Sequence, residues 1–139
     1  MTRFALPAAL VVLAGPALAD RIEVTFASSS PDIQDTTLCD TFGNLGFQSD
    51  GPDVPFFMTL TAPASHCSDP SYVIFRPGDT NAIGVTTRMA PGDTQTVEIG
   101  NGFGPGAASV NIGAICCVGL CNTGAIGSWA VDASAVPVP

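Results

Sequence analysis

The stretch ASVNIGAIC, residues 108 to 116, indicates the fold most clearly. Within it, Val110, Ile112 and Ala114 stand at alternate positions. Successive side chains of a β-strand point to opposite faces, so this spacing places the three apolar side chains on one face. We therefore predict a strand that buries one face against another layer of the protein.

Similar short alternating runs recur along the chain between clusters of Gly, Pro, Asn and Asp, and helical periodicity is nearly absent after residue 19. The other predicted strands are 21–26, 56–62, 72–75, 83–87, 95–99 and 128–131. About seven half-apolar strands require two packed layers, which predicts an all-β antiparallel sandwich of the immunoglobulin-like type. A jelly roll or a small barrel is the alternative that the same pattern allows.

The N-terminus has the three parts of a secretory signal. Arg3 precedes an apolar run from Phe4 to about Leu13, and the small-residue sequence 17–19 offers an A-x-A cleavage site. Pro7 and other breakers interrupt the run, and a membrane anchor needs about 20 apolar residues. We expect residues 1–19 to be a cleaved signal peptide, 20–133 a single domain and 134–139 an extended Pro-rich tail. The expected location is the bacterial periplasm, the cell surface or the extracellular space.

Composition narrows the choice of partners. The chain has a formal net charge of −8, with twelve acidic residues and no lysine. Only three arginines follow residue 19, too few to neutralise a series of phosphates, so a nucleic-acid partner is excluded. Residues 28–54 form the least regular region and predict a long loop with one short strand near 45–48. The sequence PGDT occurs at 77–80 and again at 91–94, and both copies suit a type II turn.

An oxidising compartment favours disulfides among the cysteines. The five cysteines are Cys39, Cys67, Cys116, Cys117 and Cys121. Two bridges and one remaining thiol are the simplest arrangement. Adjacent residues of a strand point to opposite faces, so a bond between Cys116 and Cys117 would be strained. We therefore expect one of these two to pair with Cys121, and Cys39 to pair with Cys67. A bridge from Cys67 to Cys116 or Cys117 is the alternative.

A metal site is the second hypothesis for these sulfurs. His66, Cys67, Cys117 and Cys121 could bind zinc or copper, because the spacing of the last two falls within that of zinc ligands. The usual paired Cys-x-x-Cys motifs are missing, so we expect no metal and no cofactor. No nucleophile-elbow motif accompanies His66, which we expect to be a partly exposed loop residue. The chain is therefore expected not to be an enzyme.

The sequence favours an exported binding or structural module. Loops on a rigid sheet scaffold carry recognition, which makes 28–54 and 100–106 the expected contact surface. The candidate contact residues are Phe42, Phe47 and Phe103, and the expected partner is a protein or carbohydrate surface. The alternatives are a small metal-binding protein and a subunit of an extracellular assembly that pairs through strand 21–26.

Overall fold

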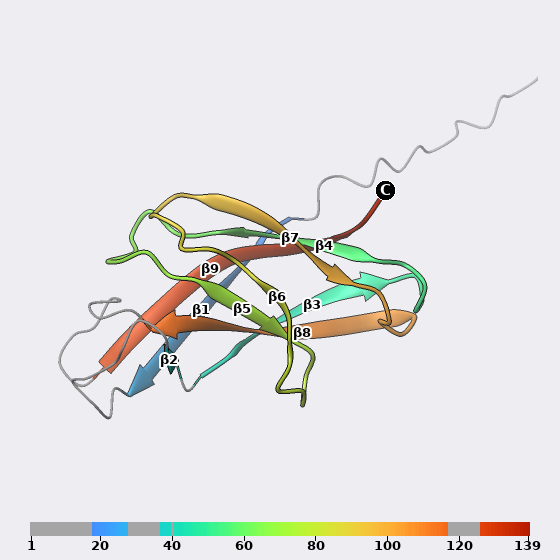
Figure 1. The fold of residues 1–139 in the computed structure, drawn as a ribbon, viewed down its shortest axis with the longest axis horizontal. Helices are drawn as coiled ribbons and strands as arrows, with labels where there is room; N and C mark the ends of the chain where they lie inside the picture. Colours follow the sequence, from blue (N-terminus) through green and yellow to red (C-terminus); the bar gives the residue numbers. More distant parts are fainter. Residues whose placement is uncertain (1–17, 28–36, 40, 117–125) are drawn as a thin grey trace, which may run out of the picture.

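The computed structural model describes residues 18–27, 37–39, 41–116 and 126–139, and this part of the chain is all β (Figure 1). The described strands are β1 (Asp20–Ala27), β2 (Thr37–Leu38), β3 (Gly43–Ser49), β4 (Phe56–Thr61), β5 (Tyr72–Phe75), β6 (Ala82–Val85), β7 (Thr94–Gly100), β8 (Gly106–Cys116) and β9 (Ile126–Pro137). Within these ranges, no helix is long and apolar enough to cross a bilayer.

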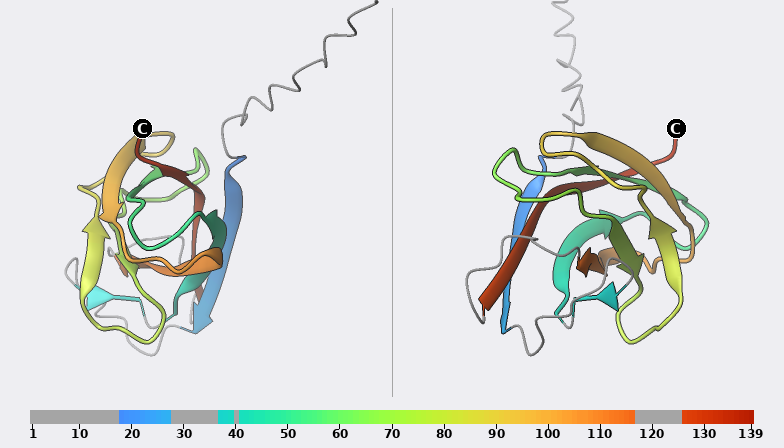
Figure 2. Two further views of the ribbon diagram at one scale, coloured as in Figure 1. Left: turned by 90° about the vertical axis from the view of Figure 1, so that its right-hand side faces the viewer. Right: turned by 60° about the vertical axis from the view of Figure 1, so that its left-hand side comes forward.

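The strands form two antiparallel sheets that face each other (Figure 2). Sheet I has the order β1-β9-β4-β7. Sheet II places β8, β5 and β6 side by side, with both β2 and β3 on the other edge of β8. The predicted two-layer sandwich is therefore confirmed.

Pairing follows a nested order. β1 pairs with β9, β3 with β8, β4 with β7, and β5 with β6, so the chain resembles one long hairpin wound around the core. Three further pairings, β4 with β9, β5 with β8 and β2 with β8, complete the sheets. This is the strand order of a jelly roll. An immunoglobulin sandwich places its first two strands side by side in one sheet, so the immunoglobulin-like prediction is not supported and the jelly-roll alternative fits.

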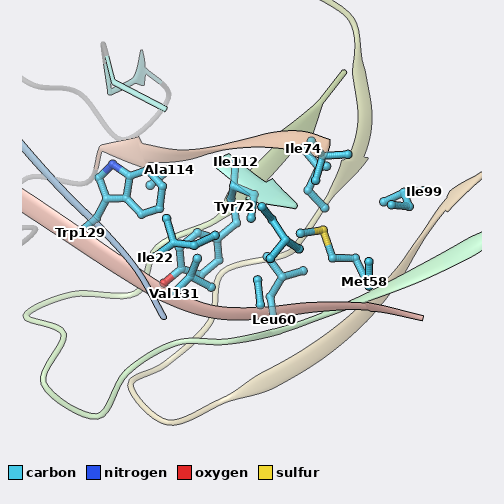
Figure 3. Close-up of a cluster of buried hydrophobic side chains, with 14 of the residues drawn as sticks. Ile22, Met58, Leu60, Tyr72, Ile74, Ile99, Ile112, Ala114, Trp129 and Val131 are labelled. Carbon is cyan, nitrogen blue, oxygen red and sulfur yellow. The ribbon is translucent and has the colours of Figure 1, made fainter. Parts of the chain in front are cut away.

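Alternate residues of the strands fill the space between the sheets (Figure 3). Met58 and Leu60 from sheet I meet Tyr72 and Ile74 from sheet II, and all four side chains are fully buried. The apolar face predicted for 108–116 is confirmed, because the core also contains Val110, Ile112 and Ala114. Burial of such side chains from water is the main favourable contribution to folding.

The C-terminal segment, expected to be an extended Pro-rich tail, continues the last described strand. β9 continues to Pro137, and residues 134–137 pair with 56–59 of β4. Ala133 and Ala135 point into the core from this part of the strand. Alanine has a low strand propensity, so the alternation of small residues gave too weak a signal to predict the strand.

Both PGDT turns form as predicted. Gly78 and Gly92 have φ of 79° and 88°, in the left-handed region that the second central position of a type II turn requires. The N–H of Asp79 donates to the carbonyl of Arg76, and the N–H of Asp93 donates to that of Ala90, which closes each turn.

Candidate functional site

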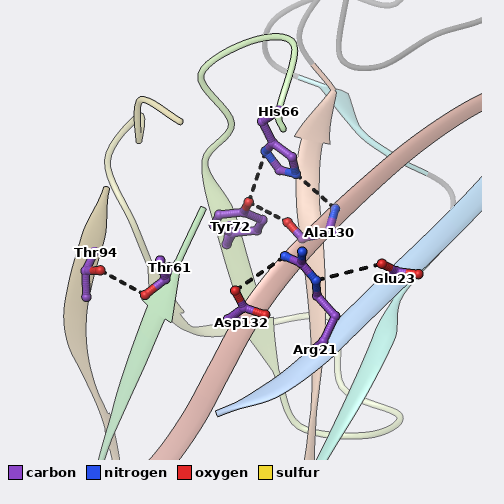
Figure 4. Close-up of polar contacts among 8 residues, drawn as sticks. All are labelled: Arg21, Glu23, Thr61, His66, Tyr72, Thr94, Ala130 and Asp132. Atoms are coloured by element: carbon purple, nitrogen blue, oxygen red, sulfur yellow. Dashed lines mark hydrogen bonds and ion pairs between the residues drawn. The ribbon is translucent and has the colours of Figure 1, made fainter. Parts of the chain in front are cut away.

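His66 is the only histidine of the chain and lies in the loop between β4 and β5 (Figure 4). The N–H of Ala130 donates to Nε2 of His66 over 3.0 Å, and the Tyr72 hydroxyl donates to the Ala130 carbonyl over 2.7 Å. Nδ1 of His66 lies 3.4 Å from the Tyr72 hydroxyl oxygen. Because Nε2 accepts a hydrogen bond, the neutral ring carries its proton on Nδ1 and donates it to Tyr72. The three residues thus form a closed ring of hydrogen bonds.

These hydrogen bonds continue the pairing between β4 and β9 beyond the point where β4 ends. Thr61 pairs with Asp132 at the end of β4, and the same register would place residue 63 opposite Ala130. Residue 63 is a proline, which has no N–H to donate, and β4 ends at Thr61. The side chains of His66 and Tyr72 therefore satisfy the backbone groups of Ala130 that β4 leaves unpaired.

Burial favours the neutral form of His66. It lowers the pKa of His66 below the ordinary value of 6.5, and the positive charge of Arg21 lowers this pKa further. His66 is buried, which corrects the prediction of a partly exposed loop residue. Both ring nitrogens have protein partners, so the ring is neither a free base nor an available metal ligand.

A cavity of about 300 Å³ lies beside the His66 side chain, on the outer face of sheet I. It is bounded by β1, β9 and the loop that carries His66, and its lining residues are Glu23, Val24, Thr25, Ser65, His66, Ser128, Trp129 and Ala130. Its volume is at the lower end of the range for small-molecule sites. Trp129 is 2% exposed and packs in the core, so its ring offers no open stacking face.

Arg21 is the charged neighbour of the cavity. Its guanidinium lies 3.3 Å from the Asp132 carboxylate and 3.8 Å from that of Glu23, and the Glu23 side chain is mostly exposed. The residues that line the cavity therefore include three that carry a hydroxyl and one that carries a carboxylate, and the nearby Arg21 guanidinium is already paired with two carboxylates.

The residues of the predicted metal site do not gather into a site within the described structure. His66 is fully hydrogen-bonded, Cys67 is exposed in the β4–β5 loop, and Cys117 and Cys121 lie outside the described residues. No group of three or more His, Cys, Asp or Glu side chains in the described ranges is arranged to bind a metal ion.

The predicted bridge between Cys39 and Cys67 is not present between these two described residues. Cys39 is 3% exposed, and its N–H donates to the Ala114 carbonyl on β8. The structure thus places Cys39 beside the C-terminal half of β8. Its hydrogen-bond partner Ala114 lies two residues before Cys116 in the sequence. Pairings that involve Cys117 or Cys121 lie outside the described residues.

The three phenylalanines predicted as a contact surface do not form one surface. Phe103 is 4% exposed and packs against Phe47, which is half-buried. The guanidinium of Arg76 lies 4.4 Å from the centre of the Phe103 ring and covers it. Phe42 alone is substantially exposed, at 48%, and packs edge-on against Phe75 on the outer face of sheet II. Phe103 is therefore covered by its neighbours and does not lie on an exposed surface with Phe42.

Sequence reasoning missed the roles of Tyr72 and Ala130. The local pattern places Tyr72 on a strand but does not indicate its hydrogen-bond partners, and an alanine side chain carries no chemical signal of its own. The hydrogen bond between Tyr72 and Ala130 depends on how the two sheets face each other, and the local sequence pattern does not determine that arrangement.

Comparisons with known proteins identify no family. No protein-family model matches the chain, and no curated protein and no solved structure is significantly similar to it.

Proposed function

We propose that the chain is an exported, non-catalytic jelly-roll module that binds a small hydroxyl-rich ligand of the carbohydrate class. The observation that carries this proposal is the cavity beside His66, whose lining residues include Thr25, Ser128, Ser65 and Glu23.

The absence of an activated group in the cavity favours binding over catalysis. A general base needs a free lone pair within reach of the substrate. In His66, Nε2 already accepts the Ala130 N–H and Nδ1 contacts Tyr72. The other candidate group, the Glu23 carboxylate, is exposed and lies 3.8 Å from the Arg21 guanidinium.

The donor set favours sugars over anions. Serine and threonine hydroxyls both donate and accept, as sugar hydroxyls do, and a carboxylate accepts from two adjacent sugar hydroxyls. An anionic ligand would need an unpaired cation, whereas the Arg21 side chain is held by Asp132 and Glu23. Because the cavity is small and lacks an aromatic stacking face, we expect weak affinity, with a Kd on the order of 1 mM.

Export and disulfide bracing belong to the same proposal. β1 begins at Asp20, directly after the expected cleavage site, and Leu18 is 90% exposed. A signal peptidase could therefore cut after Ala19 without disturbing the first strand. Intact mass of the protein recovered from the periplasm or medium tests this: we expect a chain that starts at Asp20 and has lost the hydrogens of two oxidised thiol pairs. Stoichiometric zinc or copper in that material would instead support the metal-binding alternative.

Ligand binding is tested by recording amide NMR spectra of the mature chain during titration with a panel of monosaccharides and short oligosaccharides. We expect saturable shifts at Thr25, His66 and Ser128. Ser128→Phe should abolish them, because the larger side chain fills the cavity.

Ser134→Phe is the matched control. Ser134 lies on the same strand and is half-buried like Ser128, but it lies outside this cavity. Absence of saturable shifts with every sugar, or equal loss in both variants, would contradict the proposal.

A further inference from the structure

β1 differs from the other edge strands of the sandwich. Edge strands invite pairing with other chains, and proteins usually protect them with bulges, proline, charged side chains or short length, while glycine weakens a strand. β7 carries an irregularity opposite Phe56 and Phe57, and β6 carries one opposite Ile74 and Phe75. β3 contains Gly43 and Gly46. β1 pairs with β9 in one unbroken register over eight residues and contains neither glycine nor proline.

The hydrogen bonds of Ala130 show which β1 residues point their N–H and C=O groups toward the edge of the sheet. In a strand, the N–H and C=O of one residue point to the same side. Those of Ala130 bond to His66 and Tyr72, away from β1. Glu23 lies opposite Ala130, so this is a non-hydrogen-bonded pair. The backbone groups of Glu23 therefore point to the edge of the sheet that no other described strand pairs with. Arg21 and Thr25, two residues away on either side, share this direction.

We propose that β1 is a self-association surface, and that two copies of the chain pair their β1 strands in antiparallel fashion about a twofold axis at Ile22. In this register, Arg21 of each copy lies opposite Glu23 of the other, and each such pair exchanges both backbone hydrogen bonds. The two copies thereby join their four-stranded sheets into one continuous sheet.

Charge selects this register over its neighbours. Directly opposed residues lie on the same face of a sheet, so a twofold axis must pass through a residue of β1. An axis at Glu23 would oppose two carboxylates, which is unfavourable. An axis at Val24 would oppose Glu23 to Thr25 and gain no ion pair. Of these axes, only that at Ile22 places each Arg21, which already contacts Asp132 and Glu23 of its own chain, opposite the Glu23 carboxylate of the other copy as well.

Sedimentation velocity of the mature chain at concentrations up to about 1 mM tests the proposal. We expect a reversible monomer–dimer equilibrium. Glu23→Arg replaces two attractive cross-strand pairs with two repulsive ones and should raise the dimer Kd about tenfold. The double variant Arg21→Glu with Glu23→Arg restores opposite charges and should return the Kd to near the wild-type value.

Two further variants keep the test decisive. Glu23→Pro removes an outward N–H and leaves the β9 pairing intact, so it should give a folded monomer with an unchanged circular dichroism spectrum. Glu98→Arg makes the same charge change on β7 and should not alter the equilibrium. A strictly monomeric wild type, a double variant as weak as the single one, or equal weakening by Glu98→Arg would overturn the proposal. So would a dimer that survives a denaturing gel without reductant, since its link would be a disulfide.

Discussion

Tyr72 connects the two sheets through a single oxygen atom. Its ring is fully buried among the core side chains of sheet II, and its hydroxyl reaches β9 of sheet I. A buried polar group that loses its partner costs about 1–3 kcal/mol. The hydroxyl serves two such groups, the Ala130 carbonyl and the Nδ1–H of His66.

Tyr72→Phe should therefore lower the free energy of unfolding by about 1–3 kcal/mol, measured by urea denaturation. Thr94→Val is the control, because it also removes one hydroxyl of a bonded pair, that between Thr61 and Thr94 at 2.8 Å, but on the exposed face. Its effect should stay within about 0.5 kcal/mol. Equal losses in the two variants would show that the Tyr72 hydroxyl has no special role.

His66 should make stability depend on pH in a defined window. The unfolded chain has a histidine pKa near 6.5, whereas burial lowers the pKa of His66 in the folded protein. As pH falls below about 6.5, the unfolded state takes up the proton first, so the free energy of unfolding decreases until the folded pKa is reached. Above about pH 6.5, neither state is protonated at His66 and its contribution to stability is fully present.

Urea denaturation of the wild type and His66→Gln at a series of pH values between about 5 and 8 measures this effect. Since the chain has one histidine, the difference between the two slopes reports His66 directly. A wild-type slope identical to that of the variant would show that the folded and unfolded pKa values are the same.

At the residue scale, the sequence predicted the position of His66 in a loop but not its environment. Tyr72 and Ala130 are 58 residues apart in the chain, and their hydrogen bond exists only because β5 and β9 lie in facing sheets. Phe103 looked exposed because glycines surround it, yet Phe47 and Arg76 cover it. Both the hydrogen bond of Tyr72 and the burial of Phe103 depend on contacts between segments that are far apart in the sequence.

At the scale of elements, the close approach of β1 to β3 depends on Gly43. A Cβ on Gly43 would lie 2.2 Å from Cγ2 of Ile22, within the packed core. Overpacking of a core typically costs about 1–3 kcal/mol. Gly43→Ala should lower the free energy of unfolding by this amount, measured by urea denaturation. In an Ile22→Ala background the same change should cost much less; an unchanged cost would mean that Ile22 is not the obstacle.

The C-terminal part of β9 gives a second prediction for an element. Deletion of residues 134–139 removes the partners of Phe56 to Thr59 and uncovers Met58. We expect the truncated chain to lose several kcal/mol of stability or to fail to fold, as seen in the thermal unfolding midpoint. Deletion of residues 138 and 139 alone removes one hydrogen bond, from Val138 to Pro55, and should have a small effect. Equal behaviour of the two deletions would contradict the assigned pairing.

Alternating residues predicted most strands, because each strand buries one face and the pattern is local. The predicted 72–75 strand matches β5, whereas β9 extends well beyond the predicted 128–131. Pairing could not be predicted in this way. An immunoglobulin sandwich and a jelly roll require the same half-apolar strands, and they differ only in which strands become neighbours.

At the scale of the whole molecule, the nested pairing determines when the fold can close. β9 comes last in the chain, yet it lies in the interior of sheet I, between β1 and β4. Until residues 126–137 are available, the first strand has no neighbour in its sheet. Long-range pairing of this kind is slow, because distant segments must meet before any contact is gained. In a chain exported as proposed, the first strand would thus stay unpaired and threadable through a secretion channel until β9 had been made.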